Sequence, residues 1–364
     1  MKKDPYFLYR HHNDINSILG AVKSSELPED FQLKFLFLMS KGDVFEAIKE
    51  WMPSKYTYEI LEEGKNKLTI RIEKHLNKEG DVLKGVFNIE RYENSPIYVV
   101  VTHESQKFVK GVILEFFNSN YSNASRLYLT SNQLQLLLET IKNKLDCDII
   151  TERVISYSRI DQSKIISPGL KNRKKESDLR WTEESYKSSF QRAAENDQWV
   201  DKISFYAQKE DQILFSASLS REGLFKCSKN AKDFYKIVGE ELVKIGNKNV
   251  SLFSNRSRSE NKGKIKPISI QYSSNVFEDV KQNRRLISAL SEFPKSSYSV
   301  YHGNPYLHLS MVDYIDGSSY DIWVLSSDKI VIVPQIRSTF NSLSRLCEHI
   351  LKKFQEGNIM ELTV

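Results

Sequence analysis

The chain has 364 residues, of which 40% are hydrophobic and 27% are charged. This balance excludes a disordered or fibrous protein and fits an ordinary folded chain. The net charge of +6 comes from 53 basic and 47 acidic residues, and so small an excess permits an anionic partner without requiring one. The length predicts two or three domains.

Three cysteines, Cys147, Cys227 and Cys347, lie far apart in or beside apolar runs. No CxxC or paired-histidine spacing accompanies them, so we expect buried thiols in a reducing compartment and no metal site. The basic N-terminus is not followed by a signal-peptide core, and the apolar run from Phe35 to Met39 is too short to span a bilayer. The sequence therefore predicts a cytoplasmic protein without a cofactor or a membrane association.

The first segment, residues 11–52, has apolar residues at helical spacing and predicts three helices. Pro28 is suited to the start of the second helix, Asp43 to the cap of the third, and Pro53 to its end. The apolar residues expected to face inward are Ile15, Ile18, Leu19, Val22, Phe31, Phe35, Leu38, Val44, Ala47, Ile48 and Trp51.

A strand-like region follows from residue 55 to residue 130. Turn sequences such as Glu63-Gly64-Lys65-Asn66 separate its runs, and short connections predict antiparallel hairpins. The expected strands are 56–61, 68–73, 82–92, 97–102, 109–117 and 126–129. A helix then begins at Thr130 or Ser131, with an apolar stripe formed by Leu134, Leu137, Leu138, Ile141 and Leu145.

The second half repeats this order of elements. Its expected elements are a helix at 182–196, strands at 203–206, 213–219 and 224–227, a helix from Asn230, a strand at 267–272 and a helix near 276–290. Near the C-terminus, alternation predicts strands at 306–312, 320–325 and 330–333. The apolar period then changes to that of a helix, with Phe340, Leu343, Leu346, Cys347, Ile350, Leu351 and Phe354 on one face.

Three helices, beginning near Ser131, Asn230 and Ser338, thus each follow a short strand. This echo predicts an α+β fold of antiparallel sheets, each closed by a C-terminal amphipathic helix, with an N-terminal helical segment. The expected domains are 1–160 and 182–364, joined by a basic linker at 161–181 that contains Pro168-Gly169. In element order alone, two such modules sharing one curved sheet resemble the saddle of TATA-box-binding-like folds, and this resemblance implies no function.

Two basic segments are the strongest functional signal. Lysines and arginines among serine, asparagine and glycine can follow a phosphate backbone. The candidate nucleic-acid contacts are Lys171, Arg173, Lys174 and Lys175 in the linker, and Arg256, Arg258, Lys262, Lys264 and Lys266 in the loop 254–266. Downstream tyrosines that can stack on unpaired bases are Tyr272, Tyr298, Tyr301 and Tyr306.

Two other patterns suggest chemistry. His103-Glu104-Ser105 and His308-Leu309-Ser310 resemble the paired motifs of 2H phosphoesterases, in which one imidazole is the base and the other the acid. Asp313, Asp316 and Asp321 surround a hairpin turn and could together hold Mg²⁺, although Asp-Gly at such a turn is first of all turn chemistry.

The sequence therefore favours a non-catalytic, nucleic-acid-binding subunit of an intracellular complex, with a protein partner as well as DNA or RNA. One alternative is a protein–protein scaffold that receives its partner on a free sheet face or edge. The other is a phosphodiesterase or metal-dependent nuclease.

Overall fold

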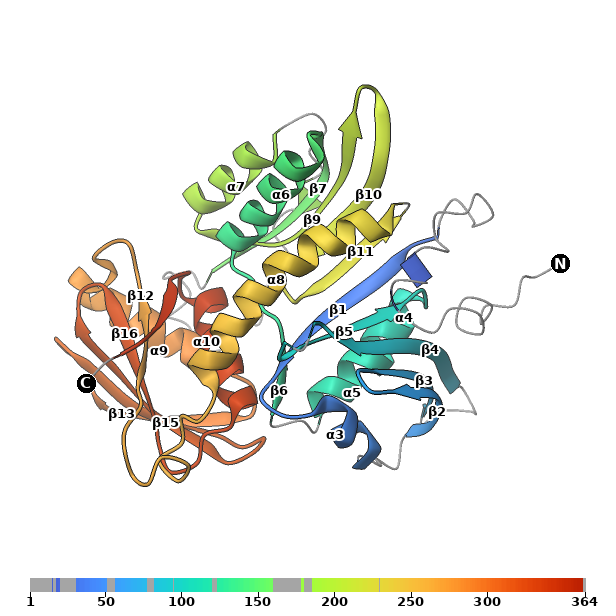
Figure 1. The fold of residues 1–364 in the computed structure, drawn as a ribbon. Helices are drawn as coiled ribbons and strands as arrows, with labels where there is room; N and C mark the ends of the chain where they lie inside the picture. Colours follow the sequence, from blue (N-terminus) through green and yellow to red (C-terminus); the bar gives the residue numbers. More distant parts are fainter. Residues whose placement is uncertain are drawn as a thin grey trace. The chain divides into compact units, whose positions relative to one another are not determined.

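The computed structural model describes Ile15, Ile18, Leu19 and residues 31–50, 56–76, 82–93, 95–119, 123–159, 178–179, 185–228 and 230–362. These residues belong to two compact units (Figure 1). Unit 1 draws on Met1–Ile155, Asp178–Arg192 and Val200–Asn247, and unit 2 on Ser156–Ser177, Ala193–Trp199 and Lys248–Val364. The predicted linker at 161–181 lies outside the described residues except for Asp178 and Leu179.

One large sheet organises unit 1. Its strands are ordered β2-β3-β4-β5-β1-β11-β10-β9-β7-β8, and β6 also pairs with β1. Strand β1 lies antiparallel between β5 and β11, so it joins strands from the first and second halves of the sequence. The bounds are β1 Leu33–Ser40, β2 Tyr56–Gly64, β3 Lys67–His75, β4 Val82–Arg91, β5 Ile97–Thr102, β6 Ala124–Arg126, β7 Asp148–Ser158, β8 Asp178–Leu179, β9 Gln198–Lys209, β10 Gln212–Ser220 and β11 Leu224–Ser228.

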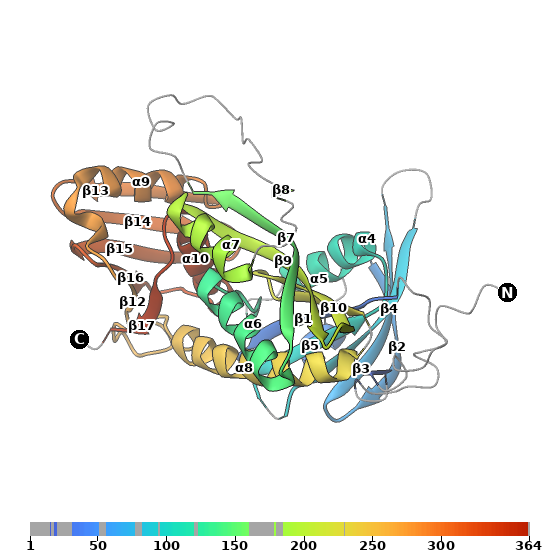
Figure 2. The same cartoon turned by 90° about the horizontal axis from the view of Figure 1, so that it is seen from above.

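Helices cover both faces of this sheet. On one face, Phe35 of β1 and Phe215 of β10 both contact Phe234 of α8, and α6 lies beside α8 in both views (Figures 1 and 2). On the other face, α3, η1 and α5 pack on a core that includes Leu36 and Val100. The bounds are α3 Val44–Glu50, α4 Gln106–Phe108, the π-helix η1 Val109–Ile113, α5 Leu114–Ser119, α6 Ser131–Leu145, α7 Tyr186–Glu195 and α8 Ala231–Phe253.

Unit 2 is built on a second sheet, ordered β13-β14-β15-β16-β12-β17, in which every neighbouring pair is antiparallel. Helices α9 and α10 pack together on one face of it (Figure 2). The bounds are β12 Ile268–Gln271, the short 3-10 helix η3 Val276–Glu278, α9 Val280–Ser291, β13 Ser296–His302, β14 Leu307–Asp313, β15 Ser318–Ser326, β16 Lys329–Pro334, α10 Phe340–Lys353 and β17 Asn358–Glu361.

The predicted fold class was wrong. The described chain is mostly antiparallel β-sheet, and the strands expected to form separate sheets in the two halves join in the single sheet of unit 1. The predicted N-terminal helical segment is not found as one segment among the described residues, because Phe35 and Leu38 of its second expected helix lie in β1. Its third expected helix is present as α3, and the Asp43 carboxylate accepts from the amide of Phe45 at 2.8 Å at its start. Before Phe31 the described residues are Ile15, Ile18 and Leu19, which are buried.

Burial explains both errors in element type. All eight residues of β1 are buried, so burial does not alternate along this strand, and its apolar residues fit a helical period as well as a strand. The expected strand at 109–117 is instead the helical run η1–α5, where Val109, Val112 and Ile113 are buried. Short runs that are mostly apolar give no clear period that separates the two structures.

Other expectations were confirmed. Thr130 and Gln133 form a capping box at the start of α6, where Leu138 is buried. The strands β14, β15 and β16 and the helix α10 follow the predicted order, and all three cysteines are buried free thiols. Among the described residues, no helix is both long and apolar enough to cross a membrane.

Candidate functional site

Of the basic residues predicted to contact phosphate, the linker group Lys171, Arg173, Lys174 and Lys175 lies outside the described residues. The loop group is described, and its backbone is held in place: the amide of Arg258 donates to the carbonyl of Gln335 at 3.0 Å. Lys262, Lys264 and Lys266 are exposed, whereas Arg258 is half-buried.

Arg256 differs from the other basic residues of this loop because its side chain is only 4% exposed. Its Nε donates to the carbonyl oxygen of Leu252 at 2.6 Å, and its NH1 group donates to Glu361 at 2.9 Å. The guanidinium therefore satisfies a carbonyl in the last turn of α8, which has no partner within the helix. Arg256 supports the fold of unit 2, and three lysines of the loop remain exposed for contact with a phosphate.

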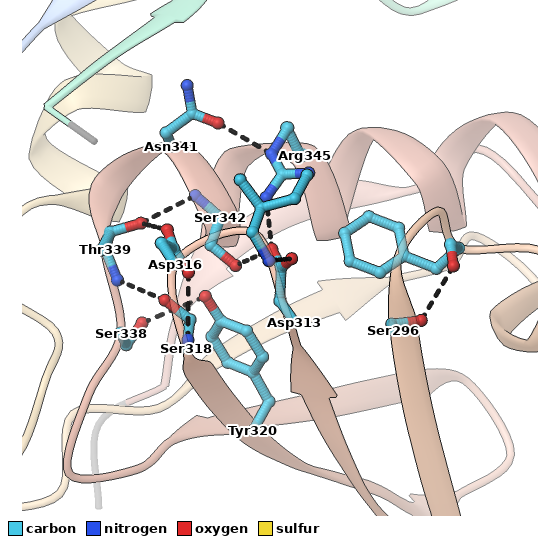
Figure 3. Close-up of polar contacts among 12 residues, drawn as sticks. Ser296, Asp313, Asp316, Ser318, Tyr320, Ser338, Thr339, Asn341, Ser342 and Arg345 are labelled. Carbon is cyan, nitrogen blue, oxygen red and sulfur yellow. Dashed lines mark hydrogen bonds and ion pairs between the residues drawn. The ribbon is translucent and has the colours of Figure 1, made fainter. Parts of the chain in front are cut away.

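Two of the three aspartates considered as metal ligands, Asp313 and Asp316, belong instead to a polar network at the start of α10 (Figure 3). The buried carboxylate of Asp313 accepts from Ser342 Oγ at 2.7 Å, from the amide of Ile315 at 3.0 Å and from Arg345. Asp316 accepts from the amide of Ser318 at 3.0 Å and from the hydroxyl of Thr339. Protein donors thus occupy these carboxylates.

The same network explains why helix α10 begins at this point. Thr339 Oγ1 accepts from the amide of Ser342 at 3.1 Å, as an N-cap does. Gly317, with φ of 74°, supplies the turn conformation expected of Asp-Gly. Asp321 accepts from Gln335 at 2.7 Å, and no group of metal-ligating side chains is found in the described part of the chain. The geometry supports a structural role for the three aspartates.

The two histidine motifs also lie in different surroundings. His103 follows β5 in unit 1, and Ser105 caps α4 by accepting from the amide of Phe108 at 3.2 Å. His308 lies on β14 in unit 2 and is stacked on Trp323. The two motifs therefore lie in different compact units, whereas those of 2H phosphoesterases usually fall within one compact domain.

Another group of cations, which the sequence did not single out, lies on the sheet of unit 1. Along β1, β11, β10 and β9, alternate side chains point to opposite faces, and the face under α8 carries Phe35, Phe215 and Phe225. The opposite face carries Leu36 and Leu224, which pack in the core with η1 and α5, and beside them it is rich in lysine and serine. We call these lysines and serines the lysine–serine face, and its residues are Lys34, Lys202, Ser204, Ser216, Ser218, Ser220, Lys226 and Ser228.

Strand register places two of these lysines directly opposite each other. Lys34 of β1 pairs with Lys226 of β11, which pairs with Ser218 of β10, which in turn pairs with Ser204 of β9. Like charges at opposed positions destabilise a sheet. The repulsion between Lys34 and Lys226 therefore lowers the stability of the folded sheet. An anion bound between their ammonium groups would offset this repulsion.

Lys34 is the most buried lysine of the face, at 8% exposure. Its Nζ donates to the carbonyl oxygen of His103 at 3.3 Å. Burial lowers the pKa of Lys34, and the nearby Glu104 carboxylate opposes this effect. Glu104 itself accepts from the amide of Val86 at 3.1 Å. Lys34 is thus partly compensated by protein groups.

Fewer protein groups offset the positive charges of Lys226 and Lys202. Burial, followed by the charges of Lys202, Lys34 and Lys110, lowers the pKa of Lys226 to about 8. Burial also lowers the pKa of Lys202, aided by Arg153 and Lys110 and opposed by Asp201 and Glu152. Within the described part of the chain, neither Lys202 nor Lys226 makes a side-chain hydrogen bond or ion pair. Both ammonium groups are thus half-buried cations without a hydrogen-bonded acceptor among the described residues.

We expect Lys226→Met to raise the free energy of unfolding by about 1 kcal/mol at pH 7, after allowance for solvent screening. The folded-state pKa of Lys226 is lowered, so folding disfavours its charged form below about pH 8. This penalty disappears as the pH rises through 8 towards the unfolded-state value. Urea denaturation at pH 7 and pH 10 measures the difference, with the exposed Lys232→Met on α8 as the control. Equal effects for both variants, or no change with pH, would contradict the penalty.

The signal for this face was present in the sequence but incomplete. Lys226 and Ser228 alternate with the buried Phe225 and Cys227, which indicates a polar face on that strand. The opposition of Lys226 to Lys34 depends on a pairing between residues 33–36 and 224–227, which no local pattern reveals. In the sequence, the density of basic residues in the loops is more visible than the lysines and serines of this face.

No protein-family model matches the chain, and neither a curated protein nor a solved structure was found that is similar to it. Any functional assignment therefore depends on the chemistry of its own residues.

Proposed function

We propose that this protein is a non-catalytic nucleic-acid-binding subunit that holds a phosphate backbone on its lysine–serine face. The observation that carries the proposal is the opposition of the buried Lys34 to the half-buried Lys226, with the half-buried Lys202 nearby. Phosphate oxygens would accept from the ammonium groups and neutralise them. Serine hydroxyls of this face can donate to the same oxygens, apart from that of Ser228, which already donates to the carbonyl oxygen of Ser216 at 3.2 Å.

The exposed lysines of the loop, Lys262, Lys264 and Lys266, support the same chemistry in unit 2. They lie in a loop with Ser259, Asn261 and Gly263, and a lysine binds phosphate as a point charge. Contacts of this kind position a nucleic acid without specifying its sequence. The proposal therefore extends to DNA and RNA alike, with affinity that depends on salt.

A salt titration tests the proposal. Binding of the full chain to a labelled oligonucleotide is measured by fluorescence anisotropy at several salt concentrations. Lys202→Gln combined with Lys226→Gln should reduce the log–log slope by about 0.7 for each lost contact on a single strand and about 0.9 on a duplex. Glutamine keeps most of the side-chain length, so the fold should be retained.

The control replaces two exposed lysines of the same unit, Lys232→Gln and Lys236→Gln on α8. This double variant removes the same net charge and should leave the slope unchanged. An equal loss in both double variants would show that only the overall charge matters. Binding that does not fall with rising salt would reject the proposal.

The edge strand β13 favours a second candidate, a scaffold that receives a partner strand. Its only neighbour in the described sheet is β14, and six of its seven residues are exposed. It carries no lysine, aspartate or glutamate, the charges with which proteins commonly protect an exposed edge. By contrast, the edge strand β2 carries Glu59, Glu62 and Glu63.

Ser299→Lys on β13 should therefore disrupt any assembly of the parent chain that light scattering detects. A parent chain that is monomeric in the same measurement would weaken this candidate.

A further inference from the structure

The second sheet has a face with a different chemistry from the lysine–serine face. On β14, Leu307, Leu309 and Met311 are buried on the side of α9 and α10. His308 and Ser310 alternate with them and therefore lie on the opposite side. His308 pairs with Trp323 of β15, which lies on that side too. This side therefore carries the rings of His308 and Trp323, opposite the core residues of β14.

Three of these rings form a row. The rings of His308 and Trp323 are stacked, with centroids 3.6 Å apart and an interplanar angle of 11°. Tyr301 of β13 lies on the other flank of His308, with centroids 4.9 Å apart. Its hydroxyl is 3.1 Å from Ser310 Oγ. Register, stacking and this hydrogen bond together orient the row.

The outer ring of the row is open to solvent. Tyr301 is 65% exposed, and Tyr306, just before β14, is 56% exposed. Large exposed aromatic rings lose water-contacting apolar surface when a planar ligand stacks on them. In addition, His308 Nε2 is buried without a hydrogen-bond partner in the described structure. The row thus ends in an exposed ring and contains a buried ring nitrogen without a partner among the described residues.

We infer that Tyr301, His308 and Trp323 form a stacking site for an unpaired base of a single-stranded nucleic acid. Aromatic rings on an open sheet face bind bases by stacking, which every base permits through its π-face. A base within a duplex is stacked on its neighbours and does not offer that face. This inference rests on the proposed function and adds to it a preference for single strands.

The decisive variant is Tyr301→Ala, because its exposed ring can be removed without opening the core. It should weaken the binding of a single-stranded oligonucleotide roughly 5- to 100-fold, as expected for one lost stacking contact. Binding of the matching duplex should not change. Tyr301→Phe keeps the ring and loses only the contact with Ser310, so it should bind the single strand almost as tightly as the parent.

A matched control is Tyr314→Ala in the turn between β14 and β15, where the tyrosine is 64% exposed. It removes a ring of equal exposure outside the row and should leave both affinities unchanged.

Failure of the inference and failure of the proposed function have different signatures. If Tyr301→Ala binds single strands as tightly as the parent while the Lys202/Lys226 variant loses its salt slope, the stacking site is rejected and phosphate binding stands. If the salt slope of the lysine variant equals that of the parent, while Tyr301→Ala loses affinity for single strands and not for the duplex, the stacking site stands and phosphate binding on the lysine–serine face is rejected. A parent that binds neither nucleic acid rejects both.

Discussion

Replacing Asp313 with alanine is expected to lower the free energy of unfolding by about 3 kcal/mol, the low end for breaking a buried ion pair. The Asp313 carboxylate is fully buried and accepts from Ser342, Ile315 and Arg345. Its removal leaves the buried Ser342 hydroxyl and the Ile315 amide without this acceptor. Arg345 is 25% exposed and can still reach water, which keeps the cost near the low end. Urea denaturation of the full chain measures it.

Asp321→Ala is the matched control, because the sequence had grouped this residue with Asp313 and Asp316 as possible metal ligands. The Asp321 carboxylate accepts from Gln335 at 2.7 Å, so its loss should cost about 1 kcal/mol. If the aspartates formed a metal site, both variants would instead lose affinity for Mg²⁺ by similar factors. Calorimetric titration of Mg²⁺ into the parent and the two variants would reveal that outcome and overturn the structural role.

The C-terminal part of the fold was predictable because its signals are local. Leu307, Leu309 and Met311 alternate with polar residues, and the turn at Asp316-Gly317 closes the hairpin. After Pro334 the apolar period changes to that of a helix, and Phe340 begins α10. Each of these features depends on residues close together in the sequence, so no knowledge of distant partners was needed.

The centre of unit 1 was not predictable in the same way. Strand β1 is buried on both faces because β5 and β11 flank it and helices cover it, and these partners lie about 60 and 190 residues away in sequence. The same long-range pairing brings Lys34 opposite Lys226. The candidate site could therefore not be found from the sequence, although its lysines and serines were visible there.

In the predicted loop site, the sequence shows which residues are basic, but it does not show which of them are buried. Arg256 and Lys262 look equivalent in a basic, serine-rich loop. The structure distinguishes them, because Arg256 is buried against α8 and Lys262 is exposed with a positive φ of 53°. Only burial and hydrogen-bond partners separate a residue that supports the fold from one that can meet a ligand.

Arg256→Ala is accordingly expected to lower the free energy of unfolding by about 3 kcal/mol, from hydrogen bonds to a charged group and the packing of the side-chain stem. The guanidinium donates to the carbonyl of Leu252 at 2.6 Å, to that of Ser251 at 3.4 Å and to Glu361 at 2.9 Å. Without it, the final carbonyls of α8 lose their donors. Arg256→Lys should recover little of this, because an ammonium group cannot reproduce the forked geometry.

The control replaces the three exposed lysines of the same loop, Lys262, Lys264 and Lys266, with serine. Exposed substitutions of this kind should change the free energy of unfolding by no more than about 0.5 kcal/mol each. If these lysines contact phosphate, the triple variant should also show a salt slope reduced by about 0.7–0.9 for each contact. A variant that replaced Arg256 together with them would lose binding through unfolding as well, so it cannot separate the two roles. An Arg256→Ala chain as stable as the parent in urea would contradict the capping role and return this arginine to the candidate phosphate contacts.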